Sequence, residues 1–343
     1  MVKSHGSSAP LSEALSRKLA RRTASTGQIT VPAVPSMIDD YVATCGNVFA
    51  DIGREFSPEE LNQLRELLQR QLDEAFAKSP RSSIVVSYSA SAASLLNYEI
   101  NIEWWSLDKA YENWISTRKP PLFGTEPDAR VWAAAGQAGA PAASPVLDIG
   151  AGTGRNALAL ARRGHPVDAV ELTPKFAEQI AEQARTEALN VRVIHGDVFA
   201  TTGELRPDYQ LILLSEVVSD FRSLQQLRGV FELAAGCLAA GGQLLFNVFL
   251  AKAGYTPDAA ARELGQQVYT SIFTEDELAM AAAGLPLIPA GDDSVHEYEE
   301  ANLPDGAWPP TSWYSDWVSG RDLFDLNRDA CPVEMRWRVY RRM

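Results

Sequence analysis

The chain of 343 residues is long enough to bury a sizeable core, and it suits one large domain or two modest ones. Its apolar content of 46% is typical of a globular protein, and no apolar run approaches the roughly 18 residues that a membrane span needs. A net charge of −13 argues against a partner that is held through its phosphates, so we expect neither a nucleic acid nor a membrane as partner.

Cysteine usage points to a reducing compartment. The three cysteines, Cys45, Cys237 and Cys331, are far apart and odd in number, which indicates neither a disulfide framework nor a metal site. The four histidines do not fall into metal-ligand spacing with a cysteine or with one another. We therefore expect free thiols, a cytoplasmic protein and no metal.

The first 36 residues differ from the rest of the chain in charge. They are rich in Ser and Ala and hold five Lys or Arg residues against one acid, Glu13. We predict a flexible basic tail over residues 1–36, ending in an extended Pro-rich linker at 31–35. Leu11, Leu15 and Leu19 recur at helical spacing, so a lid helix over the active site and an organelle-targeting peptide remain alternatives.

Residues 37–140 are predicted to form a helical N-terminal cap region. Ser57 to Glu60 read as a capping box that opens a helix, because leucines then recur at helical spacing. The short apolar run 84–88 fits a strand or a helix. Further helices are predicted over 38–56, over the aromatic-rich segment 104–118 and over 128–138.

A glycine-rich turn follows the apolar segment Val146 to Ile149 and precedes a segment of strong helix formers. Three glycines stand at alternate positions, 150, 152 and 154, and Asp148 lies two residues before the first of them. Glycines are needed where a tight turn takes positive φ or where a ligand approaches the backbone. A dinucleotide-binding turn has the spacing G-x-G-x-x-G, which this turn does not have.

Later strands end in acidic residues at regular intervals. The segment 167–172 has an acid, Glu171, next to its last residue, 23 residues after Asp148. The segment 191–198 likewise has Gly196 and Asp197 just before its last residue. A carboxylate at the end of the second strand can accept both hydroxyls of a ribose, in NAD as well as in other nucleosides. Further strands are predicted over 209–216 and 241–249, with helices over 174–189, 221–239 and 274–284 and an inserted loop or helix over 255–271.

The order and spacing of these segments, from about Ser144 to Leu250, resemble the successive motifs of the class I S-adenosylmethionine-dependent methyltransferases. The resemblance implies an α/β fold with a Rossmann-like seven-stranded sheet and helices on both faces, and S-adenosyl-L-methionine as the cofactor, bound by a catalytic domain over 141–343. In that family the segment before the first motif covers the cofactor, which places Trp114 and Arg118 near it, although packing against the core is the alternative for the aromatic residues. The cofactor-binding residues implied in this way are Asp148, Gly150, Ala151, Gly152, Gly154, Asn156, Glu171, Leu172, Asp197, Val198, Ser215, Trp114 and Arg118.

The C-terminal part contains a Pro- and aromatic-rich stretch, residues 303–317, which is predicted to be an ordered loop. Its flanks, 294–298 and 333–340, alternate apolar and polar residues and suit an antiparallel strand pair at the sheet edge, which resembles the terminal hairpin of the family. We expect the loop to bind the acceptor, with packing or a homodimer contact as the alternative.

Candidate catalytic groups follow the fourth strand. A nucleophile that carries a proton needs a base within reach, and Glu216 and Asp220 stand where that strand tip meets the transferred methyl group in the resembled family. Asp220 has the alternative role of capping the next helix. His296 and Tyr298 are weaker candidates.

The function expected from the sequence is therefore methyl transfer from S-adenosylmethionine to a small-molecule acceptor. Such a reaction depends mainly on holding nucleophile, methyl carbon and sulfur in line. Transfer to a peptide or protein, an NAD(P)-dependent oxidoreductase, and a catalytically silent cofactor-binding protein remain alternatives. The sequence leaves the acceptor and the oligomeric state open.

Overall fold

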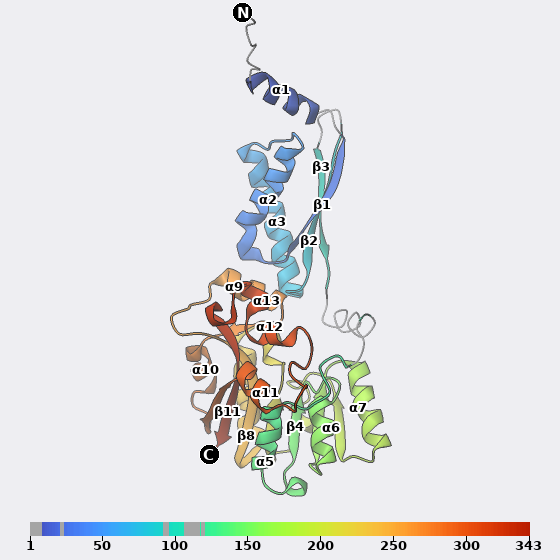
Figure 1. Ribbon diagram of the computed structural model, residues 1–343, viewed down its shortest axis with the longest axis vertical. Helices are drawn as coiled ribbons and strands as arrows, with labels where there is room; N and C mark the ends of the chain where they lie inside the picture. Colours follow the sequence, from blue (N-terminus) through green and yellow to red (C-terminus); the bar gives the residue numbers. More distant parts are fainter. Residues whose placement is uncertain (1–8, 21–23, 92–95, 106–116, 118–120) are drawn as a thin grey trace, which may run out of the picture. The chain divides into compact units, whose positions relative to one another are not determined.

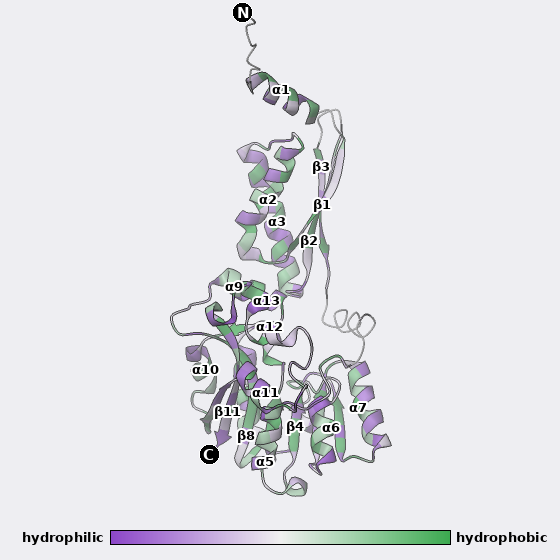
Figure 2. Cartoon of the chain, viewed as in Figure 1, coloured by the Kyte–Doolittle hydropathy of each residue, from purple (hydrophilic) through white to green (hydrophobic). Residues whose placement is uncertain are grey.

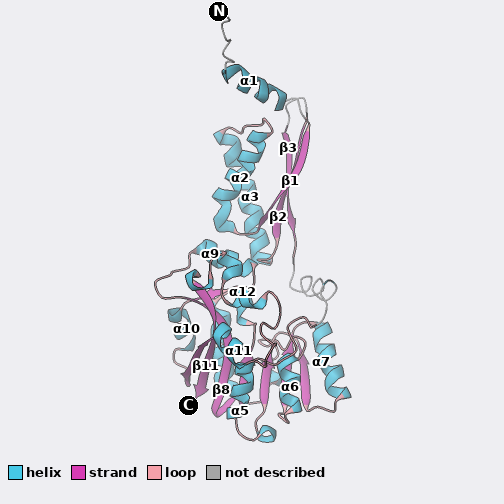
Figure 3. Ribbon diagram, in the orientation of Figure 1, coloured by secondary structure: helices cyan, strands magenta, loops and turns pink. Residues whose placement is uncertain are grey.

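The computed structural model describes residues 9–20, 24–91, 96–105, 117 and 121–343. The chain divides into two compact units, Met1–Leu107 with Ala259–Gln267, and Asp108–Asp258 with Val268–Met343 (Figure 1). Figure 3 distinguishes the helices from the strands in each. No helix within these described ranges is both long enough and apolar enough to span a bilayer.

The first unit is a three-stranded antiparallel sheet, in the order β1-β2-β3, with helices packed on it. Its core joins Phe49 of α2 and Leu64, Leu68 and Leu72 of α3 to Val86 of β2. The helix α3 begins at the capping box of Ser57 and Glu60 that the sequence predicts. The elements of this unit are α1 (Ala9–Ala20), β1 (Ser25–Pro32), α2 (Ile38–Asp51), α3 (Pro58–Lys78), β2 (Ser83–Ala90), β3 (Leu96–Glu103) and α9 (Ala259–Gln267).

Two expectations for this region are wrong. The strand β1 begins at Ser25, inside the predicted tail, and Ala33 and Val34 of the predicted linker are fully buried. The cap region is also not mainly helical, because β2 and β3 are strands. Alternate residues of β1 and β3 face solvent, so these strands are polar in sequence, and β1 pairs with a strand whose partner residues lie far along the chain, Ser25 opposite Ala90.

The inserted segment after the fifth strand of the methyltransferase-like region contains the helix α9, which packs with the first unit. Leu264 joins the core of that unit, and the Glu263 carboxylate accepts hydrogen bonds from the Ser36 backbone N–H (2.9 Å) and hydroxyl (2.7 Å). The amide of Gln267 donates to the Ser82 carbonyl at 2.7 Å. The sequence predicts a loop or helix here, but its packing partner comes from tertiary structure alone.

The second unit is built on a mixed sheet in the order β10-β11-β8-β7-β4-β5-β6, with β9 paired to β8. The pairs from β8 to β6 are parallel, and β11 is antiparallel to both of its neighbours. The seven-stranded Rossmann-like sheet predicted from the sequence is thus confirmed, with one short additional strand. The strands are β4 (Val146–Ile149), β5 (Val167–Glu171), β6 (Val191–His195), β7 (Tyr209–Leu214), β8 (Leu238–Ala251), β9 (Ile272–Phe273), β10 (Leu287–Ser294) and β11 (Val333–Arg342).

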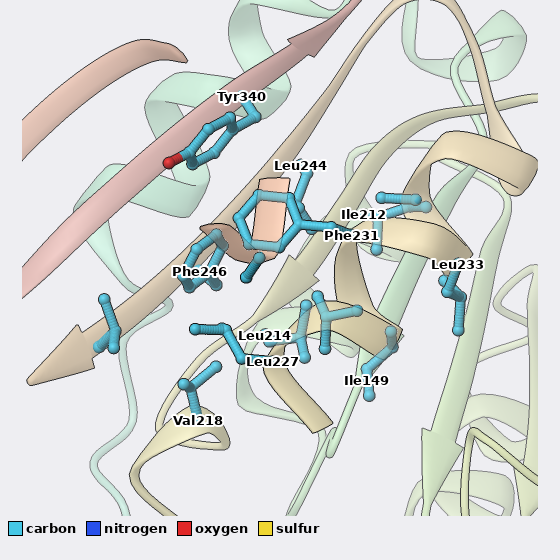
Figure 4. Packing of buried hydrophobic residues seen from close by; sticks show 14 of the residues in the cluster. Ile149, Ile212, Leu214, Val218, Leu227, Phe231, Leu233, Leu244, Phe246 and Tyr340 are labelled. Carbon is cyan, nitrogen blue, oxygen red and sulfur yellow. The ribbon is translucent and has the colours of Figure 1, made fainter. Parts of the chain in front are cut away.

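The central strands are mainly apolar on both faces, and helices cover both faces and bury them. On one face Phe231 of α8 packs edge-on against Phe246 of β8 and Tyr340 of β11, at ring separations of 5.7 and 4.8 Å (Figure 4). Polar and apolar residues share the surface of α7, as expected for a helix with one buried side (Figure 2). The helices of this unit are α5 (Ala129–Gln137), α6 (Arg155–Arg162), α7 (Pro174–Thr186), α8 (Leu224–Cys237), α10 (Glu275–Ala282), α11 (Val295–Asn302), α12 (Tyr314–Val318) and α13 (Arg321–Phe324).

The predicted C-terminal strand pair is correct for 333–340 and wrong for 295–298. The strand β10 ends at Ser294, whose side chain accepts a hydrogen bond from the Glu297 N–H and so begins the helix α11. Alternating polarity over so few residues fits either structure, and here the side-chain cap decides for the helix. The helix predicted over 104–118 lies mostly outside the described residues.

Candidate functional site

The glycine-rich turn joins β4 to α6 in a conformation that side chains would obstruct. Gly150 has φ +69°, and a Cβ there would lie 2.4 Å from a methyl group of Val217. Gly154 has φ +85°, begins α6, and would place a Cβ 2.8 Å from Leu158. Both contacts are closer than packing allows, so these two glycines are required by the fold of the turn itself.

Gly152 differs from its neighbours, because a Cβ there would meet nothing nearer than Phe123 at 3.9 Å. Its backbone N–H donates to Glu171 Oε2 at 2.8 Å, and Glu171 Oε1 accepts the Thr173 N–H at 2.7 Å. The buried Glu171 carboxylate thus locks the turn to the end of β5, and burial raises its pKa. The open side of Gly152 leaves the backbone accessible to a ligand.

Asp148 is fully buried in β4 at the base of this turn. Its Oδ2 atom has no hydrogen-bond partner among the described residues. Burial, reinforced by the charge of Asp128, raises the pKa of Asp148 to about 8. A buried oxygen without a partner is rare in folded proteins and is expected where a ligand supplies the missing donor.

The remaining strand-tip residues line the same edge of the sheet. Ala151 is buried in the turn, and Leu172 is an apolar side chain that stays 48% exposed just after Glu171. Asp197 is exposed, and its Oδ1 accepts the Phe199 N–H at 2.9 Å, while Val198 beside it is buried. Parallel strands bring their carboxyl ends to one edge, where open α/β sheets bind ligands.

A buried ionic network lies beside the turn. The Arg155 guanidinium donates to Asp128 Oδ1 at 2.5 Å and to Glu216 Oε1 at 2.8 Å. Arg155 and Asp128 are both less than one-tenth exposed. Two carboxylates therefore share one guanidinium, which leaves the network negative.

Two residues predicted to bind the cofactor belong to this network. Asn156 exchanges two hydrogen bonds with Asp128, donating from Nδ2 at 2.9 Å and accepting the backbone N–H at 3.0 Å. The Ser215 hydroxyl donates to Asp128 Oδ2 at 2.7 Å. In this structure both side chains therefore orient Asp128.

Glu216 follows β7 and has φ +62°, a conformation that is strained for a residue with a side chain. Its backbone N–H donates to Asn247 Oδ1 at 2.7 Å, which together with Arg155 maintains the strained conformation. Burial raises the pKa of the Glu216 carboxyl to about 7, against the opposing effect of Arg155. Such strain gathers at functional sites.

Asp220, the second predicted catalytic residue, ends a short 3-10 turn after Glu216. The alternative role given to it is wrong, because the cap of α8 is Ser223, whose side chain accepts the Gln226 N–H. Trp114 and Arg118 lie outside the described residues, so their predicted positions near the cofactor stay predictions.

Sequence reasoning missed the residues that complete this region. Arg155 left a signal, because a cation at a helix N-terminus opposes the helix dipole and so needs a partner. Glu299 left none: its carboxylate accepts the Ala129 and Arg130 N–H groups at 2.7 and 3.1 Å and so caps α5, and it also accepts Trp337 Nε1 at 2.9 Å.

The aromatic stretch 303–317 leads into α12. Trp308 packs edge-on against His296 and Tyr314, at ring separations of 4.9 and 5.8 Å, and His296 Nε2 lies 3.0 Å from the Ser315 hydroxyl. The Tyr314 hydroxyl is buried without a hydrogen-bond partner in the described part of the chain. Within that same part, no three His, Cys, Asp or Glu side chains are grouped as metal ligands.

Comparison with known proteins agrees with this architecture. Residues 146–242 match the family model of a methyltransferase domain. No curated protein matches the sequence.

Among solved structures, the chain is similar to a geranyl diphosphate methyltransferase in complex with SAM, at 18% identity and a TM-score of 0.50 over 63% of this chain and 85% of that one. It also resembles geranyl diphosphate C-methyltransferase from Streptomyces coelicolor A3(2) (16%, TM-score 0.47, 63% and 77%). A third similar structure is a putative sarcosine dimethylglycine methyltransferase from Galdieria sulphuraria (16%, TM-score 0.49, 68% and 97%). Residues 146–242 thus match a methyltransferase domain, in agreement with the resemblance to class I S-adenosylmethionine-dependent methyltransferases that the glycine-rich turn and the strand spacing indicate.

Proposed function

We propose that this chain binds S-adenosylmethionine at the β4–β5 edge and transfers its methyl group to a small-molecule acceptor. One observation carries the proposal: the Glu171 carboxylate is bonded to the Gly152 N–H of a turn whose spacing is that of the family. This contact holds a carboxylate and an open backbone side by side. When bound, the cofactor supplies an already activated methyl group, so the protein's main task is to position it.

The residues of the turn divide this task. The Glu171 carboxylate stands at the strand end where such an acid accepts ribose hydroxyls, and Leu172 offers an apolar surface to a base. The unpartnered Oδ2 atom of Asp148 suits an ammonium donor such as the amino group of a methionine moiety. Asp197 stands at the next strand end, where it can accept from an adenine amino group.

Glu216 is the proposed general base on the acceptor side, with Asp220 as a second acid nearby. A carboxyl whose pKa lies near 7 can both take and release a proton at neutral pH. We also propose a cytoplasmic location, which the free cysteines Cys45, Cys237 and Cys331 support.

Calorimetric titration with S-adenosylmethionine and S-adenosylhomocysteine tests the proposal, with NAD and NADP as controls. We expect micromolar binding of the two sulfur compounds and none of the nicotinamides. Glu171→Ala removes the carboxylate and should weaken binding about 10- to 100-fold, as expected for charged hydrogen bonds.

Glu178→Ala, an exposed glutamate on α7, is the matched control and should bind like the wild type. Thermal unfolding of each variant separates lost binding from lost fold. Preference for NAD or NADP, or no binding of either sulfur compound, would refute the proposal and favour the oxidoreductase alternative.

A further inference from the structure

The Tyr314 hydroxyl is a buried polar group that the fold does not explain. The residue is 2% exposed at the start of α12, and its oxygen has no hydrogen-bond partner in the described ranges. Phenylalanine would fill the same space without leaving a hydrogen bond unmade. A tyrosine in this position is therefore expected to meet a partner that comes from outside the chain.

The charges of carboxylates beside the glycine-rich turn act on this hydroxyl. Burial first, and then the charges of Glu216 and Asp128, hold the pKa of the Tyr314 phenol well above its ordinary value. The hydroxyl therefore stays protonated at neutral pH. It can accept a hydrogen bond from a ligand and donate one to a carboxylate.

Glu216 has one carboxylate oxygen to spare. Its Oε1 atom accepts from Arg155, while its Oε2 atom has no partner among the residues that the structure describes. Asp128, in contrast, is fully used, because its oxygens accept from Arg155, Asn156 and Ser215. Of the two carboxylates on Arg155, only Glu216 is thus available to a ligand.

The charge of this region selects against an anionic ligand. Arg155 is already bonded to two carboxylates, so it brings no net positive charge. Arginines of α5 and β11 are also paired with carboxylates: Arg130 with Asp293, Arg336 with Asp292 and Arg338 with Glu275. A phosphate or carboxylate placed beside Glu216 would be repelled, whereas an ammonium would be attracted.

Aromatic side chains pack around the ring of Tyr314. Trp308 packs edge-on against Tyr314, and Trp313 and Trp317 lie within 6.0 Å of the Tyr314 ring, centroid to centroid. The faces of such rings attract organic cations. Negative charge and aromatic rings together match an alkyl- or arylammonium group.

We propose that the acceptor is an amine, held between the Glu216 carboxylate and the Tyr314 hydroxyl. This inference rests on the proposed methyltransferase function and names its substrate class. Glu216 takes one proton from the bound ammonium. The freed nitrogen lone pair then forms the N–C bond to the methyl group, and the C–S bond breaks with its electron pair left on the sulfur. Tyr314 is a recognition residue that fixes the direction of that lone pair.

Three probes of one shape and different charge test the proposal: benzylamine, benzyl alcohol and benzyl phosphate. Each is titrated into the protein saturated with S-adenosylhomocysteine, whose sulfur is uncharged, so that the sulfonium of the cofactor plays no part. We expect benzylamine to bind at least tenfold more tightly than benzyl phosphate, with benzyl alcohol between them.

The variants Tyr314→Phe and Glu216→Gln should each weaken benzylamine binding at least fivefold and leave the affinity for S-adenosylhomocysteine unchanged. Tyr314→Phe should also raise the melting temperature, because it removes an unpaired buried hydroxyl. Tyr98→Phe, a partly buried tyrosine in the first unit, is the control and should alter neither.

Equal or tighter binding of benzyl phosphate, binding of none of the three probes, or unchanged benzylamine binding in Tyr314→Phe would overturn the proposal. Failure of the wild type to bind S-adenosylhomocysteine would instead overturn the proposed function on which it rests. The two failures are therefore distinguishable in one series of titrations.

Discussion

The edge of the second unit's sheet is built in two ways. The proposed cofactor side consists of short contiguous motifs: Gly150 to Gly154 after β4, Glu171 and Leu172 at the end of β5, and Asp197 after β6. The proposed acceptor side joins Asp128, Arg155, Glu216 and Asn247 through hydrogen bonds, each from a different segment.

The contrast shows how two binding surfaces can share a fold but differ in what specifies them. Backbone geometry defines the cofactor side, since a tight turn and a helix N-terminus impose their own residue types. Long-range charge pairing defines the acceptor side, where Arg155 holds two carboxylates in place. The two sides should therefore respond differently to substitution.

The largest effect should follow from Arg155→Ala. It leaves Asp128 and Glu216 buried without their cation, and breaking a buried pair from one side costs about 3–5 kcal/mol. Denaturant unfolding measures this loss. Arg162→Ala, which breaks an ion pair with Glu187 at the surface, should cost less than about 1 kcal/mol. Similar losses in the two variants would mean that the acidic side does not depend on Arg155.

Gly154→Ala should have a smaller effect, about 1–3 kcal/mol, because the new Cβ meets Leu158 at 2.8 Å and the backbone has φ +85°. Gly136→Ala is the matched control within α5. A Cβ at Gly136 meets nothing within 4 Å, so alanine should stabilise that helix by about 0.5–1 kcal/mol. Thermal unfolding gives both values, and a neutral Gly154→Ala would refute the conformational role assigned to the turn.

The smallest effect, taken over a single pH unit, concerns the pH dependence of stability. The folded chain holds the proton of Asp148 up to a pKa of about 8, whereas the unfolded chain releases it near pH 4, so this group lowers stability as pH rises between those values. Asp148→Asn should reduce the slope of stability against pH by on the order of 1 kcal/mol per pH unit.

The remaining slope should come from Glu216 and Glu299, whose pKa values are each raised to about 7. Urea unfolding between pH 5 and 8 checks this expectation. Asp208→Asn, at an exposed position, should leave the slope as it is, because the pKa of Asp208 is lowered by Arg206 and the group is ionised throughout this range. An unchanged slope in Asp148→Asn would show that the buried carboxyl is ionised in the folded chain.

The strands of the first unit could not be predicted from the sequence, whereas the parallel strands of the second unit could. The strands β4 and β5 are buried along their whole length and consist mainly of apolar residues, and β5 ends in the acid Glu171, so the sequence alone indicates both strands. The strand β1, with Ser25, Thr26, Gln28 and Thr30 among its residues, is half exposed and reads as a polar tail. Its identity as a strand depends on β2, which follows two helices later in the chain.

The sequence by itself determined the glycine-rich turn, the order of the parallel strands and the acid at the end of β5. These are local requirements, because φ at Gly154 and the burial of β4 restrict which residues can stand there. Glu216 could also be predicted as a candidate, from its place after β7.

Only the tertiary structure decided how Glu216 is held and what faces it. Its contact with Arg155 spans 61 positions of the chain, and that of Arg155 with Asp128 spans 27, so no periodicity or motif records them. The same applies to Tyr314: only the folded structure shows that its hydroxyl is buried and that the charges of these carboxylates act on it. Charge pairing depends on distances in the folded chain, and these distances are set only when the sheet brings its strand ends together.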